Sequence, residues 1–210
     1  GTGAAGLSAA LTATAEGLSV LAVEKTDYIG GTTAYSAGTC WVPNNHFQKA
    51  DGLDDSREKV ERYLDAVVGD KAEKKLRMSY VDNAPHMLQY MEHLGVQFLR
   101  SPAVVDYHSE LPETGKTGRA LEPAPFDGRK LGKVKFRNVR RPVPEFALMG
   151  GELMVRRPEV STLLGLFSKK PAPTAKAVGT ALKLGTRWAA DRLSNPRGTR
   201  LVMGNALTAR

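Results

Sequence analysis

Apolar residues are dense in the first 50 positions and few charges interrupt them, so the elements expected there are buried ones. Residues 4–16 consist mainly of Ala, Leu and other residues with good helix propensity, and Gly17 supplies a C-terminal cap. Residues 18–24 form a short apolar run, which is typical of a buried parallel strand. Residues 28–45 have no helical period and are rich in Gly, Thr and Asn, which predicts a loop.

Charged, amphipathic patterns begin after residue 50 and predict a more helical part of the chain. Three helices and one strand are expected, at residues 54–68, 72–84, 87–94 and 96–99. Residues 101–145 hold half of the prolines and little periodicity, so they are expected to wrap a surface or line a pocket. A basic helix is expected at 174–193.

Three glycines open the chain with the spacing of a dinucleotide-binding turn. Gly1 permits the tight turn, Gly3 lets the backbone approach a pyrophosphate, and Gly6 lets the following helix pack closely. The N-terminus of that helix then directs N–H groups and partial positive charge at the phosphates. Glu24 ends the next predicted strand, where an acid accepts hydrogen bonds from ribose hydroxyls. The alternative is an Ala- and Gly-rich helix start that holds no ligand.

These features predict an α/β fold, a Rossmann-like domain in which helices flank a parallel sheet. In such a sheet the strand before the glycine turn is central, yet the sequence starts at the turn itself. The domain is therefore expected to be incomplete and to pair with the remainder of a longer chain.

Composition narrows the classes of protein. The 210 residues suffice for one domain or a small two-domain protein, and no run approaches the roughly 18 apolar residues of a membrane-spanning helix. Cys40 is the sole cysteine, which excludes an internal disulfide and favours a cytoplasmic setting. The four histidines have no metal-ligand spacing, so no metal site is expected.

The net charge of +8 comes entirely from the last part of the chain. Residues 151–210 carry 11 basic and 3 acidic side chains, whereas the charges of the preceding residues sum to zero. No zinc-finger spacing, aromatic RNA-binding signature or basic heptad region accompanies this charge, so a nucleic-acid partner is not expected. The basic helix at 174–193 is interpreted either as a solvated face or as a weak contact with an anionic membrane surface.

Three motifs together resemble a known enzyme family: GTGAAG at 1–6, VLAVEK at 20–25 and GGTTAYSAGTCWVPNN at 30–45. They are similar to the flavin domain of FAD-dependent 3-ketosteroid dehydrogenases (3-oxosteroid 1-dehydrogenases), within the fumarate reductase/succinate dehydrogenase flavoprotein superfamily. Less specific matches follow at residues 106–108, 119–125, 126–129 and 197–199. The resemblance spans nearly the whole chain and implies the N-terminal fragment of a longer enzyme, without its C-terminal substrate domain.

The resemblance also implies an organisation within a partial FAD-binding domain. Residues 1–50 would form the dinucleotide-binding core, residues 51–145 a helical and irregular insertion near the active site, and residues 146–210 a basic helical segment.

FAD is the cofactor that the resemblance implies. The implied contacts are Gly1, Gly3 and Gly6 at the pyrophosphate, Glu24 at the adenosine ribose, Gly30, Gly31, Thr32 and Thr33 at the pyrophosphate and ribityl chain, and Ser36, Ala37 and Gly38 along the isoalloxazine ring. Ala4 and Lys25 are further implied cofactor-binding residues. Hydroxyls that satisfy only the local backbone are the alternative interpretation of the Thr and Ser side chains.

Tyr107 is the catalytic residue that the resemblance implies. Enzymes of this family remove a proton and a hydride from adjacent carbons of a ketosteroid ring, and the hydride goes to the flavin. A tyrosine hydroxyl can polarise the ketone or take the proton, while its ring packs on the steroid. The implied partners are a steroid-like substrate and an electron acceptor. The alternative for Tyr107 is a surface or core tyrosine without a catalytic role. The alternatives for the protein are a fumarate-reductase-like enzyme acting on a small unsaturated acid and a non-catalytic dinucleotide-binding module.

Overall fold

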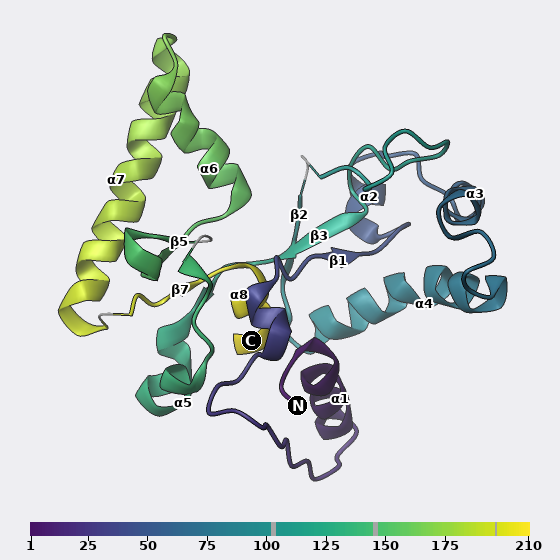
Figure 1. Cartoon of the computed structure of the whole chain (residues 1–210), viewed down its shortest axis with the longest axis horizontal. Coiled ribbons are helices and arrows are strands. Elements are labelled where there is room, and N and C mark those ends of the chain that lie inside the picture. The colour runs from purple at the N-terminus through teal and green to yellow at the C-terminus, as the bar shows by residue number, and fades with distance from the viewer. Residues whose placement is uncertain (102–103, 145–146, 196) are drawn as a thin grey trace. The chain divides into compact units, whose positions relative to one another are not determined.

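The computed structural model describes residues 1–101, 104–144, 147–195 and 197–210. They form two compact units, of which the first combines Gly1–Ala37 with Pro125–Arg210 and the second is Gly38–Ala124 (Figure 1). Each unit mixes helices with short strands, so the expected α/β class is confirmed. The three parts expected from the sequence, residues 1–50, 51–145 and 146–210, have boundaries that differ from those of these two units, and that organisation stays a prediction.

The first unit begins with helix α1 (Ala4–Ala15), as the helix propensity of its residues predicts. Residues 18–24 were expected as a buried strand, and this prediction is wrong: they form no strand, and Leu21 is 87% exposed. A β-strand needs a neighbour to satisfy its backbone, and within the described ranges no strand pairs with this segment. Its apolar side chains therefore stay at the surface.

A short 3-10 helix, η1 (Gly31–Tyr35), follows this segment and packs against helix α8 (Met203–Ala209) at the other end of the chain. Helix α8 also contacts α1, so the two ends of the chain meet within the first unit (Figure 1). Just before η1, Ile29 forms an isolated parallel bridge with Val139. All ladders that the described residues form are antiparallel, so the predicted parallel sheet is represented here by that single bridge.

The rest of the first unit consists of short strands and a long helical hairpin. In chain order it contains β4 (Phe126–Asp127), η2 (Gly128–Leu131), α5 (Gly132–Asn138), β5 (Ala147–Leu148), η4 (Met149–Gly151), β6 (Leu153–Met154), α6 (Arg157–Leu163), η5 (Leu164–Phe167), α7 (Pro171–Ser194) and β7 (Arg200–Leu201). Strand β4 pairs with β7, and β5 pairs with β6. Phe136, Leu201 and Val202 lie in the apolar core beneath them. Helix α7 confirms the expected basic helix, with a proline in its first turn.

The second unit holds an antiparallel sheet of β1 (Cys40–Trp41), β3 (Ala120–Pro123) and β2 (Phe98–Arg100), with β3 in the middle. Helices α2 (His46–Ala50), α3 (Arg57–Val68) and α4 (Lys74–His93) complete it. Helices α3 and α4 pack against each other around Val60, Met78 and Val81, with Trp41 at the edge of this cluster. Ser56 caps α3 by accepting a hydrogen bond from the backbone of Lys59.

Helix α4 runs through Pro85, so the prediction of two helices at 72–84 and 87–94 is wrong. A proline inside a helix removes one backbone hydrogen bond and crowds the preceding turn. Val81 and Leu88 are buried on either side of Pro85, and this packing holds the helix together. The expected irregular stretch 101–145 is also more ordered than predicted, since it contains β3, β4 and α5.

Candidate functional site

The turn formed by the first six residues is tight and is closed by Glu24. A side-chain carbon added to Gly6 would lie 2.0 Å from the carbonyl oxygen of Gly1, so only glycine fits there. The backbone N–H and the hydroxyl of Thr2 both donate to Oε2 of Glu24, at 2.9 and 2.6 Å. Because these two bonds favour the ionised form, the pKa of Glu24 falls to about 2. Glu24 is therefore an anion able to accept further hydrogen bonds at neutral pH.

The Gly-Gly-Thr-Thr loop lies directly against this turn. The N–H of Gly30 donates to the hydroxyl of Thr2 at 3.1 Å, and the N–H of Ala4 donates to the hydroxyl of Thr33 at 2.9 Å. A side-chain carbon on Gly31 would lie 3.4 Å from the backbone of Gly3, so the two glycine backbones face each other closely. The structure thus brings together two motifs that stand about 30 residues apart. We call residues 1–6, 24 and 30–33 the cradle.

The cradle has the features that a dinucleotide needs. Glycine backbones can approach a diphosphate closely, and the first turn of α1 presents N–H groups and the positive end of the helix dipole. The ionised Glu24 suits ribose hydroxyls. Thr32, within the cradle, and Lys25, next to Glu24 in the sequence, are both exposed. The residues present therefore fit an FAD, although each individual contact stays a prediction.

Helix α8 backs the cradle, a feature that the sequence did not indicate. The N–H of Gly204 donates to the carbonyl oxygen of Ser36 at 3.1 Å. A side-chain carbon on Gly204 would lie 1.8 Å from the carbonyl oxygen of Thr33. One feature of the sequence could have indicated this contact, namely the glycine in the first turn of a predicted helix. A helix does not need glycine there for its backbone conformation, so close packing against another backbone segment is the remaining reason for it.

The residues predicted to follow the isoalloxazine ring lie where the chain passes from one unit to the other. Ser36 is exposed at the end of η1, and its hydroxyl donates to the carbonyl oxygen of Thr33 at 2.8 Å. Ala37 is half-buried and ends this part of the first unit, whereas Gly38 is buried and begins the second. Their predicted contact with the ring stays a prediction.

An arginine beside the cradle was also missed. The Arg140 guanidinium stacks over the rings of Tyr28 and Tyr35, with 5.7 and 5.3 Å to the ring centres. It donates to the Tyr35 hydroxyl at 3.1 Å and to the Thr26 hydroxyl at 2.7 Å, and Thr26 in turn contacts Glu24. Arg140 and the two tyrosines also line a cavity of about 330 Å³. Arg140 therefore places a fixed positive charge next to the cradle, which complements a diphosphate.

Tyr107 lies in the second unit and is fully exposed. The residue before it, Asp106, is buried and hydrogen-bonded. Cys40, in the same unit, has a pKa raised by burial, so its thiol stays protonated and packs as a small apolar group. Among the described residues no three His, Cys, Asp or Glu side chains are grouped to hold a metal ion, and no helix is long and apolar enough to cross a membrane.

Comparisons with known proteins agree with this geometry. The whole chain, residues 1–210, matches the family model described as an FAD binding domain. The 3-oxosteroid 1-dehydrogenase of Mycolicibacterium smegmatis is 36% identical over 211 residues, which cover 100% of this chain and 35% of that protein. The enzyme of the same name from Mycobacterium tuberculosis H37Rv is 41% identical over 63% of this chain and 24% of its own length.

A solved structure extends the comparison to three dimensions. The 3-ketosteroid delta1-dehydrogenase from Sterolibacterium denitrificans, in complex with 1,4-androstadiene-3,17-dione, superimposes with a TM-score of 0.85 at 31% identity. The match covers 100% of this chain and 36% of that one. The chain thus spans about a third of the length of the relatives that it matches throughout.

Proposed function

The chain belongs to the FAD-binding domain family, and on that premise we propose that the whole protein is a flavin-dependent oxidoreductase that dehydrogenates ring A of a 3-ketosteroid. The observation that carries the flavin part is the cradle, in which two glycine motifs and Glu24 converge. The relatives named as 3-oxosteroid 1-dehydrogenases support the steroid part and a double bond between C1 and C2. An electron acceptor that reoxidises the flavin belongs to the same proposal.

In this proposal the residues of the cradle bind and orient the cofactor. Gly1 leaves room for the diphosphate, Gly3 and Gly31 let the two motifs approach each other closely, and Glu24 accepts hydrogen bonds from the adenosine ribose. Bound FAD supplies a ring that accepts a hydride from the substrate. Ala4 and Thr33 hold the two motifs together through their own hydrogen bond, so that the diphosphate meets a fixed surface.

In the same proposal, Tyr107 assists the proton-transfer step of the reaction. Its hydroxyl assists removal of the ring proton, either by polarising the ketone or by accepting the proton, and its ring offers an apolar face to the steroid. A fully exposed tyrosine has few contacts within its own unit, which leaves the side chain available to a ligand.

The whole protein, purified with its flavin, tests this function. We expect a flavin absorbance spectrum that bleaches when a 3-ketosteroid with a saturated C1–C2 bond is added without an electron acceptor. The matched control is succinate, which should leave the spectrum unchanged. A protein without bound flavin would contradict the proposal, whereas bleaching by succinate alone would favour a fumarate-reductase-like enzyme.

We also propose that the hairpin of α6 and α7 rests on an anionic membrane surface. Figure 1 shows α6 and α7 as a hairpin. At the turn between these helices, Leu164 is 61% and Phe167 is 85% exposed, and the exposed Lys169 and Lys170 follow after Ser168. Exposed apolar side chains bordered by lysines are typical of segments that insert shallowly into lipid headgroups. A steroid substrate partitions into membranes, so this contact would bring the enzyme to its substrate.

Sedimentation with lipid vesicles tests the membrane contact. We expect the whole protein to bind vesicles of phosphatidylglycerol more tightly than vesicles of phosphatidylcholine. The double variant Leu164→Ser, Phe167→Ser should bind about tenfold or more weakly, because burial of such a side chain contributes about 1.5–3 kcal/mol. Leu76→Ser, which removes an exposed leucine from α4, serves as the control and should bind as the parent does. Equal binding by the double variant would contradict the contact.

A further inference from the structure

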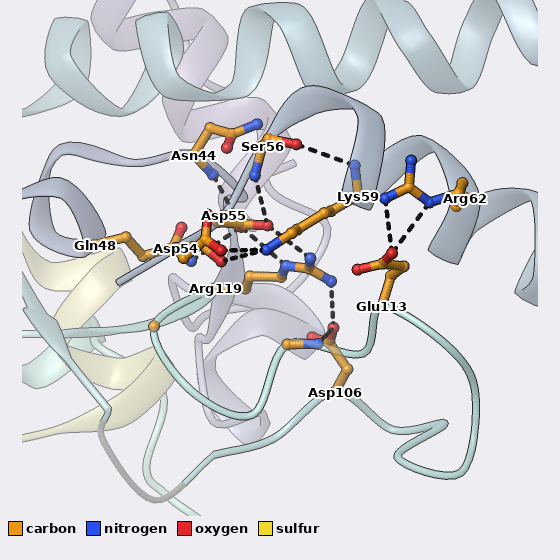
Figure 2. Close-up of polar contacts among 12 residues, drawn as sticks. Asn44, Gln48, Asp54, Asp55, Ser56, Lys59, Arg62, Asp106, Glu113 and Arg119 are labelled. Carbon is orange, nitrogen blue, oxygen red and sulfur yellow. Dashed lines mark hydrogen bonds and ion pairs between the residues drawn. The ribbon is translucent and has the colours of Figure 1, made fainter. Parts of the chain in front are cut away.

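A buried ionic cluster centred on Arg119 occupies the second unit (Figure 2). Nε and Nη2 of Arg119 donate to the two carboxylate oxygens of Asp55, at 3.0 and 2.7 Å. Nη1 donates to Oδ2 of Asp106 at 2.7 Å. The three side chains are only 3–6% exposed. One guanidinium therefore joins two largely buried carboxylates that are 51 residues apart in the sequence.

Asp106 is held on several sides by this cluster. Its Oδ1 accepts a hydrogen bond from Nε1 of Trp41 at 2.6 Å, and its Oδ2 accepts a second one from the backbone N–H of Gly115 at 2.7 Å. The backbone N–H of Asp106 donates to the carbonyl oxygen of Gly115 at 3.0 Å. The Arg119 guanidinium also lies over the Trp41 ring, 5.8 Å from its centre. Both the side chain and the backbone of Asp106 are thus fixed.

Asp55 anchors the other side of the guanidinium. It accepts hydrogen bonds from the side chain of Gln48 at 3.0 Å and from the backbone N–H groups of Asn44 and Ser56, at 3.4 and 3.1 Å (Figure 2). Burial acts to raise the pKa of Asp55, but the hydrogen bonds and charge of Arg119 outweigh it, and the pKa is lowered overall. The carboxylate therefore remains charged and keeps Arg119 in one orientation.

Such a cluster is better suited to fixing geometry than to adding stability. Removing charges from water offsets most of their mutual attraction, and apolar residues of similar volume often stabilise a fold as well. The cluster instead fixes the position of Asp106. Because Tyr107 is the next residue, its backbone is constrained as well. Asp106 is 6% exposed and Tyr107 is 100% exposed. The chain therefore passes, within one residue, from a fixed buried anchor to a side chain that is free to meet a ligand.

We propose that Arg119 and Asp106 are positioning residues for Tyr107, which they hold through the backbone at the place where its hydroxyl meets the steroid. This inference rests on the proposed role of Tyr107. Trp41 takes part by fixing the second oxygen of Asp106. A reacting hydroxyl displaced by about 1 Å can lose on the order of a hundredfold in rate, so an anchor of this kind has a catalytic consequence without touching the substrate.

A double-mutant cycle in the whole, FAD-loaded protein tests this proposal. Arg119→Lys keeps the charge but cannot donate to both carboxylates in the same planar geometry. Trp41→Phe removes one hydrogen bond to Asp106 and is the milder variant should Arg119→Lys fail to fold. We expect each to lower kcat by about tenfold or more while the flavin content stays unchanged. In a Tyr107→Phe background, the same substitutions should change kcat less than twofold.

The control and the contrary outcomes separate positioning from general damage. Glu113 lies in the same loop as Asp106 and forms an ion pair with Arg62 of α3 (Figure 2). Glu113→Gln breaks this ion pair and should leave kcat unchanged in both backgrounds. An equal loss of kcat with and without Tyr107 would show a structural role and overturn the proposal. An unaltered kcat in Tyr107→Phe itself would also overturn it, while steroid-dependent bleaching by the parent would still support the proposed function.

Discussion

Gly204→Ala is expected to weaken FAD binding by the whole protein by roughly tenfold to a hundredfold. The added carbon would lie 1.8 Å from the carbonyl oxygen of Thr33 and 2.9 Å from that of Ser36. Both are backbone atoms and cannot rotate away, so η1 or α8 must move. Overpacking of this kind typically costs about 1–3 kcal/mol, and each 1.4 kcal/mol is about tenfold in affinity. The displaced η1 carries Thr33, which joins the two halves of the cradle.

Titration of the flavin-free protein with FAD measures this effect, with flavin fluorescence as the signal. Gly179→Ala is the matched control, because Gly179 lies in α7 and a side-chain carbon there would have no atom of the described part of the chain within 4 Å. The control should bind FAD as the parent does. Equal affinity of Gly204→Ala and the parent would show that α8 does not support the cradle.

Features of the cradle that depend on local chemistry could be predicted from the sequence. The spacing of Gly1, Gly3 and Gly6 is a direct consequence of turn geometry and the approach of a diphosphate, so it stands out in one short window. The same holds for the Gly30 and Gly31 pair, whose positive backbone φ angles of 121° and 51° favour glycine. That these two windows meet in space was an inference from a resemblance, and the hydrogen bond from Ala4 to Thr33 now gives it a geometric basis.

Features that depend on distant partners could not be predicted. The apolar run at 18–24 has the composition of a strand, but a strand exists only when another strand pairs with it. Gly204 matters because of Thr33, far away in the sequence, and Arg140 because of Tyr28 and Tyr35. The periodicity and composition of the sequence around Gly204 and Arg140 do not indicate those contacts. The prediction that the helix ends before Pro85 was wrong for the same reason, because the packing of buried neighbours on α4 decides whether the helix continues.

The two units give the proposed function two separable signatures. The cradle lies wholly in the first unit, and Tyr107 with its anchor lies in the second. A change at Gly204 should therefore lower the affinity for FAD, whereas a change at Tyr107 should alter turnover with the flavin retained. A protein that lost both properties together in every variant would indicate general unfolding rather than loss of a specific contact.

Tyr107→Phe is expected to lower turnover of a 3-ketosteroid by roughly a hundredfold while FAD remains bound. The substitution removes one hydroxyl from a side chain that is fully exposed within its unit, so it leaves no cavity and no unpaired buried group. The rate of flavin bleaching by the steroid, recorded without an electron acceptor, measures the effect directly, because reoxidation of the flavin then plays no part.

Tyr90→Phe provides the control for loss of a tyrosine hydroxyl in the same unit. The Tyr90 hydroxyl is buried and has no hydrogen-bond partner among the described residues, so its removal should leave both stability and bleaching rate unchanged or slightly improved. If Tyr107→Phe bleaches as fast as Tyr90→Phe, Tyr107 takes no part in proton removal, and the proton acceptor must be sought elsewhere in the whole protein. If only Tyr107→Phe is slow at equal flavin content, the loss lies in the chemical step, since neither folding nor cofactor binding then differs between the two variants.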